Sequence, residues 1–236
     1  MDGFTFVNLF DTKGIEYIII IAFLLLIIPF WVLLNRPVNV KSGSSVQTLP
    51  LSSVLSAVPQ GILFSKNHTW AHLLRSGEAR IGICSLLTNL TGSVNLKMLK
   101  EPGSRVARGE ILAEISQNGK RMTIVSPVSG TVTGLNPSLG DDPSLLHEDP
   151  YGKGWVCSIR PADWIAETGG FSVADGATAW FRMELERIRD FMANKARKSA
   201  NDSSAVYLQD GGEPAGQLLA SMPPEVWHAF QKEFLE

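Results

Sequence analysis

Apolar positions divide the chain into parts of different character. The longest apolar run extends from Tyr17 to Leu34 and contains no charged residue (YIIIIAFLLLIIPFWVLL). At about 1.5 Å per residue, such a run is long enough to cross a hydrocarbon core of ~30 Å. We therefore predict a transmembrane helix over residues 15–35, in contact with the lipid bilayer, after a short extracytoplasmic N-terminus over residues 1–14.

A cleaved signal peptide is the alternative interpretation of this run. Signal peptides begin with a positively charged segment and end at a small-residue cleavage site. Here the preceding segment is acidic, with Asp2, Asp11 and Glu16 against Lys13, and no Ala-x-Ala-like site follows. The pattern favours a retained anchor.

Flanking basic residues predict the orientation of the anchor. Arg36 and Lys41 follow the apolar run, whereas Lys13 precedes it. Because Lys and Arg accumulate on the cytoplasmic side of a membrane span, this bias places the soluble part in the cytoplasm. We predict a single-pass protein of the inner (cytoplasmic) membrane.

The central part of the chain has the pattern of a small antiparallel β domain. Residues 36–59 mix Pro, Ser, Gly and Val without periodicity and are typical of a linker. From residue 60 to 165, short apolar runs alternate with turn signals at intervals of about ten residues, which predicts a mainly β sandwich or barrel. Residues 86–90 are expected to form one short helical turn. The clearest turn signals are Ser76-Gly77, Pro102-Gly103, Asn118-Gly119 and Ser129-Gly130.

The periodicity of apolar residues over residues 166–198 predicts a helical extension after the β domain. An amphipathic helix is predicted from Asp175 to about Lys198, because its apolar positions recur on one helical face. This helix either packs on the β domain or docks on a partner. The positions of the apolar face are Phe181, Leu185, Ile188 and Met192.

The chain ends in a second amphipathic segment. Residues 199–216 are polar and linker-like, and residues 217–236 contain a short helix from Pro223 to Leu235. Its apolar stripe includes Trp227, Phe230 and Phe234, which are candidate partner-binding residues because aromatic side chains anchor many interfaces. Packing back on its own domain is the open alternative.

Composition limits the classes of partner and chemistry. The net charge of -2 and the lack of a basic cluster argue against nucleic acid as a partner. Cys84 and Cys157 have apolar neighbours and no metal-type spacing, so we interpret them as buried free thiols of a reducing compartment rather than a disulfide. His68 and His72 are four residues apart in a predicted strand, where that spacing does not converge on a metal.

No catalytic group stands out in the sequence. We find no Ser-His-Asp, Cys-His or paired-carboxylate pattern and no glycine-rich phosphate loop. We therefore predict a protein that is not an enzyme, has no metal site and has no small-molecule substrate of its own.

The hairpin predicted between Ala113 and Gly130 carries the remaining candidate chemistry. Asn118-Gly119 is the strongest short signal for a type I′ turn, because both central residues need a positive φ. Lys120 follows this turn directly. The hairpin therefore has a lysine close to its tip.

Several motifs in order give residues 60–165 a resemblance to the H protein of the glycine cleavage system, a member of the lipoyl/biotinyl carrier superfamily. This resemblance implies an antiparallel lipoyl-like fold of the barrel-sandwich hybrid type. The motifs are Asn67-His-Thr-Trp70, Leu90-Thr-Gly-Ser-Val94, Gly109-Glu110, Pro127-Val-Ser-Gly130 and Glu148-Asp-Pro-Tyr-Gly-Lys-Gly-Trp155.

The resemblance also implies a lipoyl-lysine at the hairpin tip, and here the sequence departs from the family pattern. In that family the modified lysine lies eleven residues before the Gly of Pro-Val-Ser-Gly. Counting back from Gly130 gives Gly119, so Lys120 is one position late. One residue of slip turns a strand side chain to the opposite face. The family's acidic residue three positions before the lysine falls at Ser116, so we expect an unmodified hairpin without a cofactor; lipoate on Lys120 is the alternative.

Two functional hypotheses follow from these observations. The first is a membrane-anchored, non-lipoylated adapter or accessory subunit of a larger membrane complex, for which a redox or respiratory complex is one setting. Its contact surfaces would be Asn118, Gly119 and Lys120 together with the C-terminal aromatic residues. The second is a carrier with lipoate on Lys120 that moves an intermediate or electrons between partner enzymes at the membrane. An envelope export adaptor is disfavoured, because its lipoyl-like fold is split by a coiled coil and this chain has no heptads.

Overall fold

The structure, a computed structural model, describes residues 9–34, 59–198 and 217–236. The chain divides into two units, residues 1–47 and 48–236, which are described separately. The predicted linker over 199–216 lies outside the described residues, as do residues 36–58 of the first predicted linker and residues 1–8 of the predicted extracytoplasmic N-terminus.

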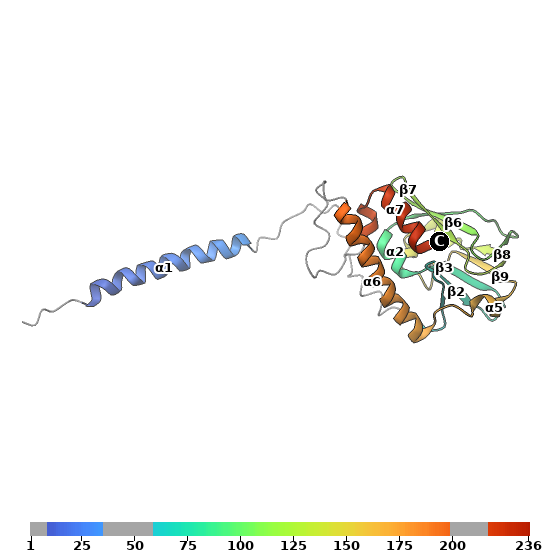
Figure 1. Ribbon diagram of the computed structural model, residues 1–236, viewed down its shortest axis with the longest axis horizontal. Coiled ribbons are helices and arrows are strands. Elements are labelled where there is room, and N and C mark those ends of the chain that lie inside the picture. Colours follow the sequence, from blue (N-terminus) through green and yellow to red (C-terminus); the bar gives the residue numbers. More distant parts are fainter. Residues whose placement is uncertain (1–8, 35–58, 199–216) are drawn as a thin grey trace, which may run out of the picture. The chain divides into compact units, whose positions relative to one another are not determined.

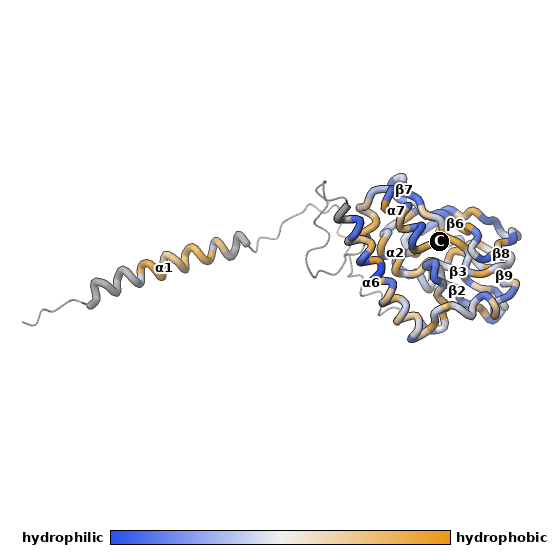
Figure 2. Tube along the Cα trace, in the orientation of Figure 1, coloured by the Kyte–Doolittle hydropathy of each residue, from blue (hydrophilic) through white to orange (hydrophobic). Residues whose placement is uncertain are grey.

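The first unit contains one helix, α1 (Leu9–Leu34), which has Pro29 inside it. Its side chains are described from Tyr17 to Phe30, and all of them are exposed. Figure 2 shows this part of α1 as hydrophobic along its length. Among the described residues, no helix combines the length and the hydropathy needed to cross a membrane.

The second unit is built on two antiparallel sheets (Figure 1). The larger sheet has the order β1-β2-β3-β9-β8-β5 and the smaller has the order β4-β6-β7. The predicted mainly β, antiparallel fold is confirmed. The strands are β1 (Leu63–Phe64), β2 (Thr69–Leu73), β3 (Ala79–Ile83), β4 (Asn95–Met98), β5 (Arg105–Val106), β6 (Ile111–Gln117), β7 (Lys120–Val125), β8 (Gly130–Leu135) and β9 (Cys157–Pro161).

Helices lie between the strands and also follow the last strand, β9. The short helical turn predicted over residues 86–90 is confirmed as α2. The helices and turns of this unit are α2 (Ser85–Thr91), α3 (Ser138–Asp141), α4 (Leu145–Glu148), α5 (Trp164–Thr168), α6 (Ala174–Lys198), the 3-10 turn η3 (Leu218–Ser221), α7 (Pro224–Phe230) and η4 (Gln231–Leu235).

Two hydrophobic clusters form the core. The smaller one includes Ile81, Leu112 and Ile159, from both sheets. The larger one contains Trp70 and the apolar faces of α2, α6 and α7. A side chain at Gly82 would overlap the Trp70 ring, so the glycine leaves the space that this indole occupies.

The prediction for α6 is confirmed by its burial. The helix begins at Ala174, one residue before the predicted start, and reaches Lys198. All four predicted apolar positions are at most 6% exposed. The helix therefore packs on the β domain, as one of the two alternatives expected. The four buried positions of α6 are Phe181, Leu185, Ile188 and Met192.

The last predicted helix also packs on its own domain. It begins at Pro224 as α7 and continues through η4 to Leu235. The aromatic residues of its stripe, Trp227, Phe230 and Phe234, are at most 4% exposed. Phe230 and Phe234 stack with ring centroids 4.5 Å apart. These aromatic side chains are therefore buried against the domain and do not form an exposed surface.

Removal of a ring from the α6 contact should destabilise the domain. Phe181 is fully buried and lies edge to face with Phe64 at a centroid distance of 5.0 Å. We expect Phe181→Ala to lower the free energy of unfolding by about 3–5 kcal/mol through lost burial and a cavity. Urea unfolding of the full chain, followed by tryptophan fluorescence, measures this. Met183→Ala is the matched control, because Met183 on the same helix is 61% exposed. Equal midpoints for the two variants would contradict the packing described.

Candidate functional site

The hairpin of strands β6 and β7 has the predicted two-residue turn. Gln117 pairs with Lys120 across it, and the central residues Asn118 and Gly119 have φ of 48° and 79°. Positive φ at both central positions is the type I′ geometry that suits the twist of a hairpin. Asn118 and Gly119 are exposed at the tip, and Lys120 begins the return strand, as predicted.

The side chain of Lys120 is buried, although a lysine next to a hairpin tip would ordinarily reach solvent. Only 7% of the residue is exposed. Its ammonium donates hydrogen bonds to three backbone carbonyls: those of Ala220 at 2.6 Å, Met222 at 3.2 Å and Leu219 at 3.5 Å. A lysine ammonium has three donors and no acceptor, so these carbonyls match its full donor set.

A tryptophan ring completes the surroundings of this ammonium. The Nζ atom lies 5.0 Å from the centroid of the Trp227 ring, within the range of a cation–π contact. The indole Nε1 donates to the Leu219 carbonyl at 2.7 Å, which fixes the ring beside the lysine. Burial lowers the pKa of Lys120 below its ordinary value, while carbonyl oxygens and the π face stabilise its charged form.

The residues around Lys120 belong to one element, which we call the C-terminal segment (Gln217–Glu236). It is fixed at both ends: the Gln217 amide donates to the Asn89 carbonyl at 2.6 Å, and the Asn67 side chain donates to the Leu235 carbonyl at 2.8 Å. The segment therefore packs on the β7 strand of the hairpin and is bound to the domain at both of its ends.

One side chain fixes the register of this segment on β7. The Gln231 oxygen accepts from the Thr123 amide at 3.1 Å, and the Gln231 amide nitrogen donates to the Thr123 hydroxyl at 2.6 Å. Two bonds between the same residues set both position and orientation, so α7 and η4 lie along the strand that starts with Lys120.

The structure separates the predicted partner-binding residues into two groups. Asn118 and Gly119 are exposed, whereas the others are buried in the domain. In this arrangement the predicted set does not form one exposed surface, because the C-terminal aromatic residues pack on the domain, which was the alternative left open. The buried members are Lys120, Trp227, Phe230 and Phe234.

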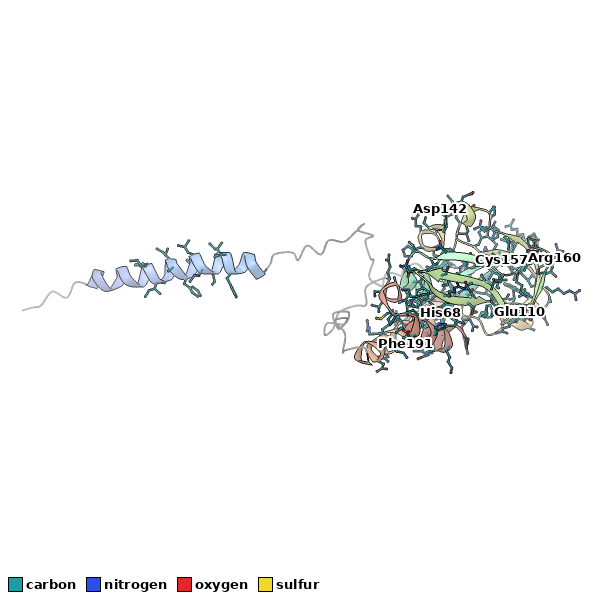
Figure 3. The ribbon with its side chains drawn as sticks, turned by 90° about the horizontal axis from the view of Figure 1, so that it is seen from above. His68, Glu110, Asp142, Cys157, Arg160 and Phe191 are labelled. Atoms are coloured by element: carbon teal, nitrogen blue, oxygen red, sulfur yellow. The ribbon has the colours of Figure 1, made fainter. Side chains whose placement is uncertain are left out.

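A second polar cluster lies inside the larger core. His68 is fully buried, and its Nε2 lies 3.1 Å from a carboxylate oxygen of Glu184. Its Nδ1 lies 3.3 Å from the Cys84 sulfur. Glu184 also accepts from Arg187 at 2.8 Å, and Figure 3 labels His68 within the domain. This contact between Cys84 and His68 was not predicted from the sequence.

The register of β2 and β3 explains the missed pair. Thr69 lies opposite Ile83, so the next step outward brings His68 opposite Cys84. Correct prediction of the register between β2 and β3 would have placed His68 next to Cys84. Glu184 comes from α6, more than a hundred residues along the chain, and no local pattern indicates it.

The charge of this cluster depends on its neighbours. Burial by itself would lower the pKa of His68, but Cys84 and Glu184 together raise it to about 9. Burial opposes ionisation of Glu184, yet His68 and Arg187 hold the pKa of its carboxyl below the usual value. The result is a buried ion pair between His68, the residue before β2, and Glu184 of α6. With both groups sealed from solvent, it stabilises packing and offers no access to a substrate.

Both cysteines are closed off from solvent. Cys84 and Cys157 are free and buried, as predicted. Burial raises the pKa of Cys157 to about 12, so this thiol stays protonated. His72 lies on β2 with an exposed side chain and does not join His68. Within residues 17–30, 59–195 and 217–236, no group of three His, Cys, Asp or Glu side chains has the arrangement of a metal site.

A surface hollow of about 630 Å³ lies at the edges of β5, β8 and β9. Arg105 and Arg160 line it together with Glu110, and Figure 3 labels the last two. Glu110 is already bonded to the Lys100 ammonium and the Ala107 amide. No lining residue of this hollow belongs to the hairpin tip or the C-terminal segment, so it is separate from the Lys120 site.

Comparison with known proteins identifies the domain. The glycine cleavage H-protein family model matches residues 62–172. A probable glycine cleavage system H protein of Pyrococcus abyssi is 35% identical over 104 residues, which cover 44% of this chain and 77% of that protein. The chain belongs to the glycine cleavage H-protein family. The Corynebacterium jeikeium H protein is 30% identical over 53% of this chain and 98% of its own length.

A solved structure is also similar. The H protein of Mycobacterium marinum has 27% sequence identity and a TM-score of 0.44, and the match covers 50% of this chain and 93% of that one. H-proteins are carriers and not enzymes, so family membership confirms the expectation that this chain is not itself an enzyme. Helix α1 and the C-terminal segment lie outside the matched residues.

The His68–Glu184 pair should make stability depend on pH. A folded pKa of about 9 against an ordinary 6.5 means that the pair stabilises the folded state fully below about pH 6.5. This contribution is lost as pH rises through about 9. We therefore expect the difference in free energy of unfolding between wild type and His68→Gln to shrink from pH 6.5 to 9.5. Urea unfolding at each pH measures it, with His72→Gln as the exposed control. A difference that stays constant over this interval would rule out the protonated pair.

Proposed function

We propose that this protein is a membrane-anchored, non-lipoylated adapter, an accessory subunit that uses the H-protein fold as a binding scaffold. One observation carries the proposal: the ammonium of Lys120 is bound by three carbonyls of the protein's own C-terminal segment. The lysine is thereby engaged in folding instead of being presented at the hairpin tip.

The family's lipoyl group does not fit the residues around Lys120 in this arrangement. Attachment would convert the ammonium into a neutral amide and add an acyl chain at Nζ. That atom is enclosed by the Leu219, Ala220 and Met222 carbonyls and by the Trp227 ring. The exposed tip residues are Asn118 and Gly119, and neither has a side-chain amine to modify.

Helix α1 supports the membrane anchor in this proposal. Its described side chains from Tyr17 to Phe30 are almost all apolar and are exposed on every face. A helix that is hydrophobic all round needs an apolar environment, either a large core or a bilayer. The Arg36 and Lys41 bias and the free thiols favour the cytoplasmic side of the inner membrane for the H-protein domain.

An anchor favours an adapter over a shuttle. A carrier that visits several soluble enzymes gains from free diffusion, whereas a subunit of a membrane assembly is concentrated beside its partners by an anchor. The partners would be other protein subunits, contacted through the exposed Asn118-Gly119 turn and neighbouring surfaces. A redox or respiratory complex is the setting that we propose.

A lipoyl carrier is the second candidate, and the relatives favour it. Proteins similar to this chain are named glycine cleavage system H proteins. If the C-terminal segment left the hairpin, Lys120 would be exposed next to the tip. The carrier would then hold lipoate on Lys120 and move an intermediate or electrons between partner enzymes.

The mass of the native protein distinguishes the two candidates. We express the full chain in its own cell and extract it in mild detergent. We expect its mass to be that of a chain in which Lys120 is unmodified. Intact-mass spectrometry with peptide mapping measures this, and an H protein with a lipoyl group from the same cells serves as the positive control. A lipoyl adduct that disappears in Lys120→Ala would establish the carrier instead.

Extraction also tests the adapter and its anchor. We expect the wild-type chain in the membrane fraction, where mild detergent releases it with other subunits at a mass well above its own 25.7 kDa. A variant without residues 1–35 should move to the soluble fraction, because the apolar helix is gone. Wild-type protein that is soluble, or monomeric after gentle extraction, would contradict the proposal.

A further inference from the structure

We infer that the C-terminal segment is an intramolecular cap on Lys120, and that docking of the segment and acylation of this lysine exclude one another. The inference deepens the proposed function and rests on it in part, because it gives the reason that the lysine stays unmodified.

The cap recognises the ammonium itself. Three converging carbonyls and one indole face form a receptor that is specific for a positive group with three donors. Two of these carbonyls accept at 2.6 and 3.2 Å, and hydrogen bonds from a charged donor are the stronger kind. The Leu219 carbonyl is shared with Trp227, which ties the lysine to the anchor of α7.

Acylation removes what this receptor binds. The Lys120 amine attacks the acyl carbonyl carbon after losing one proton, a second proton leaves as the amide forms, and the bond to the leaving group breaks. The product amide has no charge and one N–H in place of three. The Ala220 and Met222 carbonyls would then lose charged donors, and the new acyl group would need the space beside Nζ that the three carbonyls and the Trp227 ring now line, so acylation disfavours the docked cap.

The same coupling acts in the other direction. If acylation weakens docking of the cap, then docking weakens acylation by the same factor, because the two equilibria form one thermodynamic cycle. The contacts of Gln231 with Thr123, and the burial of Phe230 and Phe234, hold the cap closed. A partner that binds the C-terminal segment would therefore expose the lysine.

Acetylation with N-hydroxysuccinimidyl acetate tests the protection of the lysine. Each transfer forms the amide and releases N-hydroxysuccinimide. Lys97 is the internal standard, because it is exposed on β4 of the same sheet. In the full-length protein we expect Lys120 to react at least about tenfold more slowly than Lys97, which corresponds to about 1.4 kcal/mol of opening.

Variants of the cap should remove this protection. Trp227→Ala deletes the aromatic contact. Gln231→Ala removes the hydrogen bonds of a half-buried side chain to Thr123 and Glu236, so this variant tests the inference if Trp227→Ala fails to fold. We expect the Lys120 rate to rise in both while the Lys97 rate is unchanged. Equal rates for Lys120 and Lys97 in the wild-type protein would overturn the inference.

Hydrogen exchange tests the opposite direction. We expect Lys120→Gln, which mimics the neutral amide, to speed amide exchange in residues 217–236 about tenfold or more, with β3 and β9 unchanged. Lys120→Arg keeps the charge and should restore most of the protection, and Lys97→Gln should have no effect. Unchanged exchange of residues 217–236 in Lys120→Gln would overturn the coupling.

The two proposals fail in different experiments. A lipoyl adduct on the native protein, with a loosened segment in Lys120→Gln, would end the adapter proposal and leave the switch standing. An unmodified native protein in which Lys120 reacts as fast as Lys97 would end the switch and leave the adapter standing.

Discussion

The structure depends most on one buried charge, the ammonium of Lys120. Placing an ammonium inside a protein is unfavourable unless its donors are matched, and here three carbonyls of the C-terminal segment match them. The same turn that supplies these carbonyls leads into α7, whose Trp227 side chain covers the lysine. This contact region holds the start of α7 on β7, in addition to the hydrogen bonds that fix the two ends of the segment.

This contact region lies where the H-protein family places its chemistry. The two-residue turn puts Asn118 and Gly119 at the tip and starts the return strand at Lys120. A strand alternates its side chains between two faces, so a shift of one residue redirects the lysine from solvent to the domain. The hairpin therefore binds the chain's own C-terminal segment without any change of fold.

Helix α6 and the C-terminal segment, which both lie outside the matched family domain, pack together. Helix α6 contributes Glu184 to the buried ion pair with His68, and the C-terminal segment contributes Phe230 and Phe234, whose rings lie 6.4 and 6.2 Å from the imidazole. One aromatic cluster thus joins both extensions to β2. The family fold supplies the sheets, and the extensions determine which of its surfaces remain exposed.

The sequence determined the elements whose signals are local. Asn118-Gly119 specifies its turn through φ alone, and the spacing of Phe181 and its neighbours defines the buried face of α6, so both were predicted. The ordered motifs also identified the family. Only the tertiary structure decided the state of Lys120 and the pairing of His68 with Glu184. Their partners lie 99 to 116 positions away along the chain, and apolar spacing does not encode which distant carbonyl or carboxylate meets a given side chain.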